Sequence, residues 1–110
     1  MMAKFGMTLC ALGIAEEMRE EGIASNTLWP RTLVATAAVQ NLLGGDAAMA
    51  RARRPELYAD AAYAILTRDS REFSGNFCID DEILAGVDLD QYKASPDAEL
   101  QIDIFVEEKA

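Results

Sequence analysis

Few side chains in this 110-residue sequence have the types and spacing that chemistry requires. Histidine is absent, which removes the usual general base and the most common metal ligand. The adjacent carboxylates of Asp80 and Asp81 offer the oxygen ligands that divalent cations prefer, but no further ligands cluster beside them. We therefore expect no metal site, and we expect the two aspartates to cap a strand end in a solvated turn.

The two cysteines, Cys10 and Cys78, each lie among apolar neighbours and form no Cys-x-x-Cys motif. Isolated cysteines of this kind are usually buried and reduced, which predicts a cytoplasmic protein. The apolar stretch from Phe5 to Ala15 runs into charged residues with no cleavage site, and it is too short to cross a bilayer. It therefore predicts neither a targeting segment nor a transmembrane segment.

The charge balance limits the partners of the chain. There are 10 basic and 19 acidic residues, which give a formal net charge of −9. A chain this acidic repels the phosphates of nucleic acids and of anionic membranes, so we expect neither as a partner. The one basic cluster consists of Arg51, Arg53 and Arg54. We interpret it as a solvated helix end or loop and not as an anion site.

Chemical groups need elements to position them, and the apolar patterning indicates helices that alternate with two short strands. We expect a helix over residues 2–20, a strand over 23–28, helices over 32–43, 47–53 and 55–66, and a strand over 76–79. Gly22 ends the first helix, and Asp46 caps the helix that follows it. Pro30 ends the first strand, because it lacks the N–H that a central strand needs.

The first predicted helix is apolar around most of its circumference, which is typical of a helix buried between a sheet and a partner. The strand over 76–79 shows little alternation, which indicates a parallel strand covered on both faces. Helices that alternate with such strands predict an α/β fold with a parallel sheet. Two strands are too few for a stable layered domain, so the pattern is that of one side of a larger domain.

The character of the chain changes after residue 80, where Asp and Glu become frequent. This composition predicts a surface tail, with a short strand over residues 100–106. We therefore divide the chain into residues 1–84 and an acidic C-terminal tail, residues 85–110.

Three segments together resemble the short-chain dehydrogenase/reductase family. Residues 1–7 resemble the stretch around the lysine of that family's Tyr-x-x-x-Lys motif. Residues 22–30 are similar to the family's strand with Asn four residues before Pro, and residues 55–81 to its last helix, Ser/Thr-Gly turn and final strand. The sequence is most similar to the hydroxysteroid-dehydrogenase-like branch. The resemblance implies the C-terminal portion of a Rossmann-type, doubly wound parallel sheet, with about two core strands and flanking helices.

The resemblance also implies roles for single residues, and it implies NAD or NADP as the cofactor of the parent family. Lys4 matches the catalytic lysine, whose charge lowers the tyrosine pKa and which holds the ribose hydroxyls of the nicotinamide half. Pro30 matches the turn beside the nicotinamide, Leu33 the position whose backbone meets the carboxamide, and Thr36 a threonine of that loop, offset by one residue. Arg31 departs from the usual glycine, which leaves the backbone path of the loop open.

The rest of the family's catalytic set does not match. Its tyrosine would stand four residues before Lys4, one place before Met1. Tyr58, Tyr63 and Tyr92 are not followed by lysine four residues later, and no G-x-G-x-x-G occurs. We therefore expect that the 110-residue chain neither binds the dinucleotide tightly nor catalyses turnover. Alternatively, Lys4 is simply an exposed residue of a frayed terminus.

Two functions follow from these observations. The first is a partial short-chain dehydrogenase/reductase, from a family of NAD(P)-dependent alcohol and carbonyl oxidoreductases. The alternative is a small non-catalytic protein that pairs, through its first helix and an open sheet edge, with itself or with a complete dehydrogenase subunit. In either case we expect Asn26 to make structural hydrogen bonds and Trp29 to serve in packing.

Overall fold

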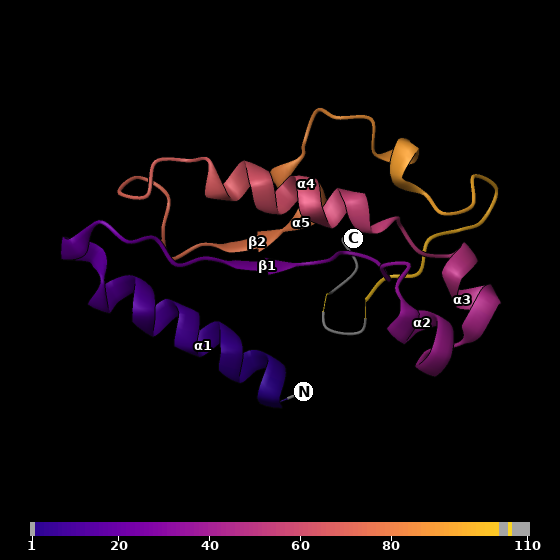
Figure 1. Ribbon diagram of the computed structural model, residues 1–110, viewed down its shortest axis with the longest axis horizontal. Helices are drawn as coiled ribbons and strands as arrows, with labels where there is room; N and C mark the ends of the chain where they lie inside the picture. The colour runs from indigo at the N-terminus through magenta and orange to yellow at the C-terminus, as the bar shows by residue number, and fades with distance from the viewer. Residues whose placement is uncertain (1, 104–105, 107–110) are drawn as a thin grey trace.

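The computed structural model describes residues 2–103 and residue 106 (Figure 1). The helices are α1 (Met2–Glu17), α2 (Ala37–Leu42), α3 (Gly45–Ala50), α4 (Pro55–Leu66) and α5 (Asp80–Ile83), and the strands are β1 (Thr27–Trp29) and β2 (Phe77–Ile79). Two 3-10 turns complete the set, η1 (Arg19–Glu21) and η2 (Leu89–Tyr92). None of the described helices is long and apolar enough to cross a membrane.

The two strands form a parallel sheet in which Thr27 is paired with Phe77 and Trp29 with Ile79. Helix α1 lies on one side of the strands and α4 on the other (Figure 1). This arrangement confirms the predicted α/β fold, a partial doubly wound parallel sheet with two core strands. Pro30 follows β1 directly, at the place where the sequence predicted its end.

The helix predicted over residues 32–43 is wrong in its first half, because only α2 is helical there. Backbone groups ahead of α2 are bonded to other segments: the Leu33 N–H donates to the Gln101 carbonyl at 3.0 Å, and the Ala35 N–H to the Arg53 carbonyl at 2.8 Å. Thr36 then caps α2, with its hydroxyl accepting from the Val39 N–H. Tertiary pairing has overridden the helical pattern of this stretch.

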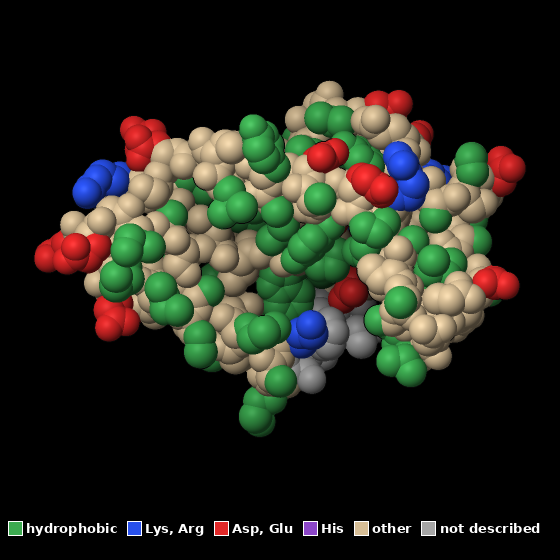
Figure 2. Space-filling model, viewed as in Figure 1, with side chains coloured by type: hydrophobic (Ala, Val, Ile, Leu, Met, Phe, Trp, Pro, Cys, Tyr) green, Lys and Arg blue, Asp and Glu red, His purple; other side chains and the backbone are tan. Residues whose placement is uncertain are grey.

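One cluster of the apolar core lies beside α2 and α3. It consists of Leu33, Val39, Ala48 and Ala52, with Ala35 and Met49 packed against it. Further buried side chains lie elsewhere in the described structure, among them Leu57 and Ala61 of α4 and Cys78 of β2. Helix α1 is different, because Ala15 is its one buried residue among those described. Its exposed large side chains are Met2, Phe5, Met7, Leu9, Leu12 and Ile14. Figure 2 shows hydrophobic side chains at the surface along the lower left, where α1 runs in Figure 1. The expectation of a buried first helix is therefore wrong for this chain by itself.

The acidic C-terminal segment returns to the body of the molecule, passing beside α3 and α2 in Figure 1. The Ala94 N–H donates to the Ala52 carbonyl at 3.0 Å, and the Gln101 N–H donates to the Arg51 carbonyl at 3.0 Å. In place of the strand predicted over residues 100–106, the described residues show a single bridge between Thr32 and Ile102, and residues 104–105 lie outside the described part. The division at residue 84 stays a prediction.

The basic cluster takes part in this packing. Arg51 and Arg54 lie exposed at helix ends, as expected, and their guanidinium groups donate to the carbonyls of Glu99 and Gln91. Arg53 contradicts the expectation of a solvated position, because its side chain is 12% exposed and pairs with Asp81.

Candidate functional site

A cleft of about 540 Å³ opens beside β1. Its walls come from α1, from β1 and the residues around it, and from α4, and Leu43 and Asp103 complete the lining. None of the lining residues belongs to β2. Since β2 pairs with β1 in a two-stranded sheet, the cleft follows the part of β1 that carries no strand neighbour in the described structure. The described fold therefore leaves a hollow where the sheet is open.

Lys4 lines this cleft together with Pro30, 26 positions further along the chain. Lys4 is exposed and lies inside α1, two positions after the first residue of that helix. No hydrogen bond or ion pair joins its ammonium group to any other described residue. The structure thus brings two of the four predicted site residues together and leaves a positive charge available at the cleft.

The other two predicted site residues lie outside the cleft lining. Leu33 is buried in the core, with its N–H bonded to Gln101 and its carbonyl accepting from the Arg53 N–H at 2.9 Å. The Thr36 hydroxyl serves as the cap of α2. Roles for Leu33 and Thr36 in binding a cofactor remain predictions.

Aromatic packing fixes the wall of the cleft that carries Lys4. The ring centroids of Phe5 and Trp29 are 5.9 Å apart, with an angle of 39° between the rings. Tilted pairs at this distance are favourable beyond the area that they bury. Because Phe5 follows Lys4 directly, this contact holds the first turn of α1 against the end of β1. Trp29 therefore takes part in packing, as the sequence predicted.

Tyr58 is a cleft residue that the sequence analysis did not assign to the site. Its hydroxyl donates to the Leu28 carbonyl at 2.6 Å. Burial raises the pKa of the Tyr58 phenol, and the charge of Asp80 raises it further. A proton-relaying tyrosine needs the opposite, a lowered pKa. The helical spacing of Tyr58 and the buried Ala61 was the signal that could have placed this side chain inward.

Asn26 ties together the segments on either side of the sheet. Its amide nitrogen donates to the Phe73 carbonyl at 3.1 Å, and its amide oxygen accepts from the Asn76 N–H at 3.1 Å. Ser25 connects the same segment to α1, because its hydroxyl donates to the Ala11 carbonyl at 2.9 Å. The prediction of a structural role for Asn26 is confirmed.

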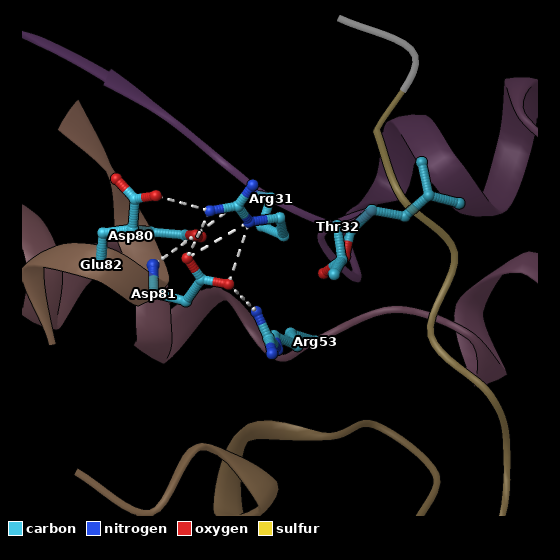
Figure 3. A network of polar contacts seen from close by, with 7 residues as sticks. Arg31, Thr32, Arg53, Asp80, Asp81 and Glu82 are labelled. Carbon is cyan, nitrogen blue, oxygen red and sulfur yellow. Dashed lines mark hydrogen bonds and ion pairs between the residues drawn. The ribbon is translucent and has the colours of Figure 1, made fainter. Parts of the chain in front are cut away.

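At the carboxyl end of β2, five charged side chains form a network that we call the Arg31 cluster (Figure 3). Its members are Arg31, Arg53, Asp80, Asp81 and Glu82. Asp80 is 2% exposed, and one oxygen of its carboxylate accepts from two backbone N–H groups, that of Arg31 at 3.0 Å and that of Asp81 at 2.8 Å. The predicted capping of the strand end is confirmed, and the predicted solvated turn is wrong.

The guanidinium groups of the Arg31 cluster meet on the next carboxylate. The Arg31 Nε lies 3.2 Å from an oxygen of Asp81, and the Arg53 Nη1 lies 3.3 Å from the same oxygen. A second nitrogen of Arg31 reaches Glu82 at 2.9 Å. Burial raises the pKa of the Asp80 carboxyl, and the two N–H groups that it accepts from offset part of that rise.

Neither a metal site nor a cysteine pair adds chemistry to the described residues. Within residues 2–103 and 106, no group of three or more His, Cys, Asp or Glu side chains is placed to hold a metal ion. Cys78 is buried as expected, and burial raises the pKa of its thiol. Cys10 is exposed, which contradicts the expectation for that residue.

Known proteins match nearly the whole chain. A short-chain dehydrogenase from Mycobacterium thermoresistibile, solved by crystallography, has 62% sequence identity and a TM-score of 0.84 over 96% of this chain. These residues match part of a short-chain dehydrogenase/reductase. A crystal structure of a dehydrogenase from Xanthomonas campestris gives 50% identity and a TM-score of 0.87, also over 96% of the chain.

The curated relatives agree on the branch of the family. Hydroxysteroid dehydrogenase-like protein 2 from Xenopus laevis is 49% identical, and the protein of that name from Homo sapiens is 43% identical, each over 97% of this chain. The recognition from three short segments is therefore confirmed. The chain spans 26% of the length of these two relatives and 39% of each of the two solved chains. No family model matches the chain.

Proposed function

We propose that these residues supply the lysine and the nicotinamide-side turn of an NAD(P)-dependent alcohol or carbonyl oxidoreductase, and that the 110-residue chain has no turnover by itself. The observation that carries the proposal is the cleft shared by Lys4 and Pro30. The family resemblance independently assigns both residues to the nicotinamide side.

The residues of the cleft fit one end of a dinucleotide. The Lys4 ammonium can donate hydrogen bonds to ribose hydroxyls, and its charge favours the phenolate of a tyrosine placed beside it. A pyrophosphate group is usually held by a glycine-rich turn at a helix N-terminus, and the sequence has no such motif. A bound dinucleotide would supply the hydride. The chain's own contribution is to orient the ribose and to tune a proton donor.

The proton donor of this reaction has to come from outside these residues. Among the described side chains, Tyr58 is the tyrosine in the cleft, and both burial and the charge of Asp80 keep its phenol protonated. Its hydroxyl is also occupied by the Leu28 carbonyl. We infer that a longer dehydrogenase chain supplies the tyrosine and further strands, which continue the sheet along the open side of β1.

The proposal is tested with a chimeric protein in which these residues replace the matching segment of the Mycobacterium thermoresistibile dehydrogenase. Titration with NADH and NADPH, followed by fluorescence, should give saturable binding for the chimera and none in the micromolar range for the 110-residue chain. Lys4→Ala should weaken binding about ten- to a hundredfold, because charged hydrogen bonds are lost. Lys93→Ala serves as the control, since Lys93 bonds to the Pro96 carbonyl and not to the cleft.

Two outcomes would contradict this proposal. One is tight dinucleotide binding, or oxidation of an alcohol, by the purified 110-residue chain. The other is a chimera that binds NADH equally well with and without the Lys4→Ala substitution.

A second candidate is association without catalysis, with a second copy of the chain or with a complete dehydrogenase subunit. The uncovered apolar side chains of α1 and the open side of β1 favour it. Sedimentation velocity separates the outcomes: a defined oligomer supports this candidate, and a heterogeneous aggregate contradicts it. The cytoplasmic location inferred from the cysteines stays a prediction in either case.

A further inference from the structure

Arg31 stands where the family resemblance leads us to expect a glycine, and its backbone N–H, its carbonyl and two guanidinium nitrogens, Nε and Nη2, are engaged. Its backbone N–H donates to the Asp80 carboxylate at 3.0 Å, and its backbone carbonyl accepts from the backbone N–H of Asp103 at 2.9 Å. Its side chain is 11% exposed, and the guanidinium group binds Asp81 and Glu82. One residue thus joins the turn after Pro30 to the end of β2 and to the C-terminal segment.

Arg53 holds the same turn from the other side. Its N–H donates to the Leu33 carbonyl at 2.9 Å, and its carbonyl accepts from the Ala35 N–H at 2.8 Å. Its guanidinium reaches the Asp81 oxygen to which Arg31 is paired. Asp81 therefore links the two arginines (Figure 3). The segment of residues 31–35 is held at Arg31 by Asp80 and, at Leu33 and Ala35, by the backbone of Arg53.

The charges argue against a site for an anionic ligand. Two arginines face three carboxylates in the Arg31 cluster, so its net charge is −1 if all five groups are ionised. Both guanidinium groups already have carboxylate partners. The fork of an arginine can hold two carboxylates at once, whereas a lysine offers a single charged point. This chemistry suits a set of ion pairs that holds the backbone in place. We call the ion pairs of Arg31 with Asp81 and Glu82 the clasp.

We propose that Arg31 is a positioning residue, whose clasp with Asp81 and Glu82 sets the course of the turn between Pro30 and Leu33. The inference rests on the proposed function for its purpose, because that turn forms the nicotinamide side of the cleft. In place of a glycine that adapts its backbone, this chain uses a side chain to hold one backbone path. The clasp acts on the cofactor site through Pro30 and touches no reacting atom.

The test measures amide hydrogen exchange by NMR on the 110-residue chain. In Arg31→Ala, the amides of Leu33 and Ala35 should exchange about ten- to a hundredfold faster, since charged hydrogen bonds that hold the turn are lost. The amides of α4 should exchange at their original rate, which separates a local effect from a loss of global stability. In Arg31→Lys, the exchange rates of Leu33 and Ala35 should lie between those of the wild-type chain and Arg31→Ala, because lysine keeps the charge and loses the forked guanidinium.

Trp29 supplies an independent optical reading, because it is the single tryptophan of the sequence and lies two positions before Arg31. We expect its emission to shift in Arg31→Ala and in Asp81→Asn, which spares Arg31 and breaks the clasp. Arg19→Ala is the matched control, since Arg19 pairs with Glu16 at the exposed end of α1. Unchanged emission and exchange in both clasp variants would overturn the proposal, and so would equal acceleration at every amide.

The clasp and the proposed function can fail separately. A chimera that binds no dinucleotide, combined with faster exchange at Leu33 and Ala35, would refute the function and leave the clasp. A chimera that binds NADH while Arg31→Ala leaves the turn unchanged would refute the clasp and leave the function.

Discussion

Helix α1 and the Arg31 cluster place their side chains against expectation in opposite directions. Six large apolar side chains of α1 are exposed, among them Leu9 at 68%. In the Arg31 cluster a carboxylate is 2% exposed and the side chain of Arg31 11%. The hydrophobic effect normally drives the first kind inward and desolvation keeps the second kind outward.

The difference teaches which part of the chain finds compensating contacts within the described residues, although the Nε of Arg53 is buried without a hydrogen-bond partner. Buried charges persist only where hydrogen bonds and opposite charges compensate them, and the Arg31 cluster has both within one chain. An apolar helix with a single buried alanine has no such compensation here. We infer that the segment around the Arg31 cluster folds on its own contacts, whereas α1 requires surface from another chain segment or subunit.

The largest effect should come from removing the central carboxylate of the cluster. Asp80→Ala leaves the buried N–H groups of Arg31 and Asp81 without an acceptor and removes a negative charge beside two arginines. We expect the free energy of unfolding to fall by about 3 kcal/mol. Urea unfolding followed by circular dichroism measures the change.

Asp97→Ala is the control for this substitution, because Asp97 is exposed in the C-terminal segment. It should change stability by less than about 0.5 kcal/mol. Equal effects of the two substitutions would mean that the Arg31 cluster adds nothing to stability, and the contrast with α1 would be lost.

A smaller effect should separate the two faces of α1. Ala15 is 4% exposed and lies against Gly75, so Ala15→Gln overpacks this contact and should cost about 2 kcal/mol. Leu9→Gln introduces the same residue on the exposed face and should change stability by less than about 0.5 kcal/mol. Sedimentation should show less self-association for Leu9→Gln alone. A large loss of stability in Leu9→Gln would mean that α1 is covered in solution.

Much of the fold was predictable from local sequence signals. Pro55 and the apolar stripe behind it predicted α4, and Pro30 predicted the end of β1. The stretch after Pro30 was not predictable in this way, because the groups that pair with Leu33 and Ala35 belong to Gln101 and Arg53, remote in sequence. The burial of α1 was predicted wrongly, since an apolar helix looks the same whether or not its partner is present.

The candidate site was predictable only in part, for a similar reason. Family motifs pointed to Lys4 and Pro30, and these two do share the cleft. The engagement of the Leu33 N–H with Gln101 depends on where the C-terminal segment returns, which local patterns do not encode. Asp80 and Asp81 were placed correctly at a strand end, but adjacent acidic residues usually indicate solvent, and nothing nearby in sequence pointed to Arg31 and Arg53 as their partners.

The smallest expected effect concerns the pH dependence of the cluster. Burial raises the pKa of Asp80 above its ordinary value of 3.8, and the hydrogen bonds from Arg31 and Asp81 limit the rise. Between the unfolded and the raised folded pKa, the folded state binds more protons, so stability falls as pH increases. The contribution is fully present below the unfolded pKa and is lost as pH passes the folded one. Because the same carboxyl accepts hydrogen bonds from two N–H groups in its ionised form, the loss should be smaller than the effect of Asp80→Ala.

Asp80→Asn cannot titrate, so the stability of the wild-type chain relative to this variant should decrease from acidic to neutral pH in urea unfolding. Asp97→Asn, at an exposed position, is the control for the loss of one carboxylate. If the stability of the wild-type chain relative to Asp80→Asn instead increased with pH, the arginines would stabilise the ionised carboxylate more than burial destabilises it. Asp80 would then behave as the salt-bridged anion of a surface cluster.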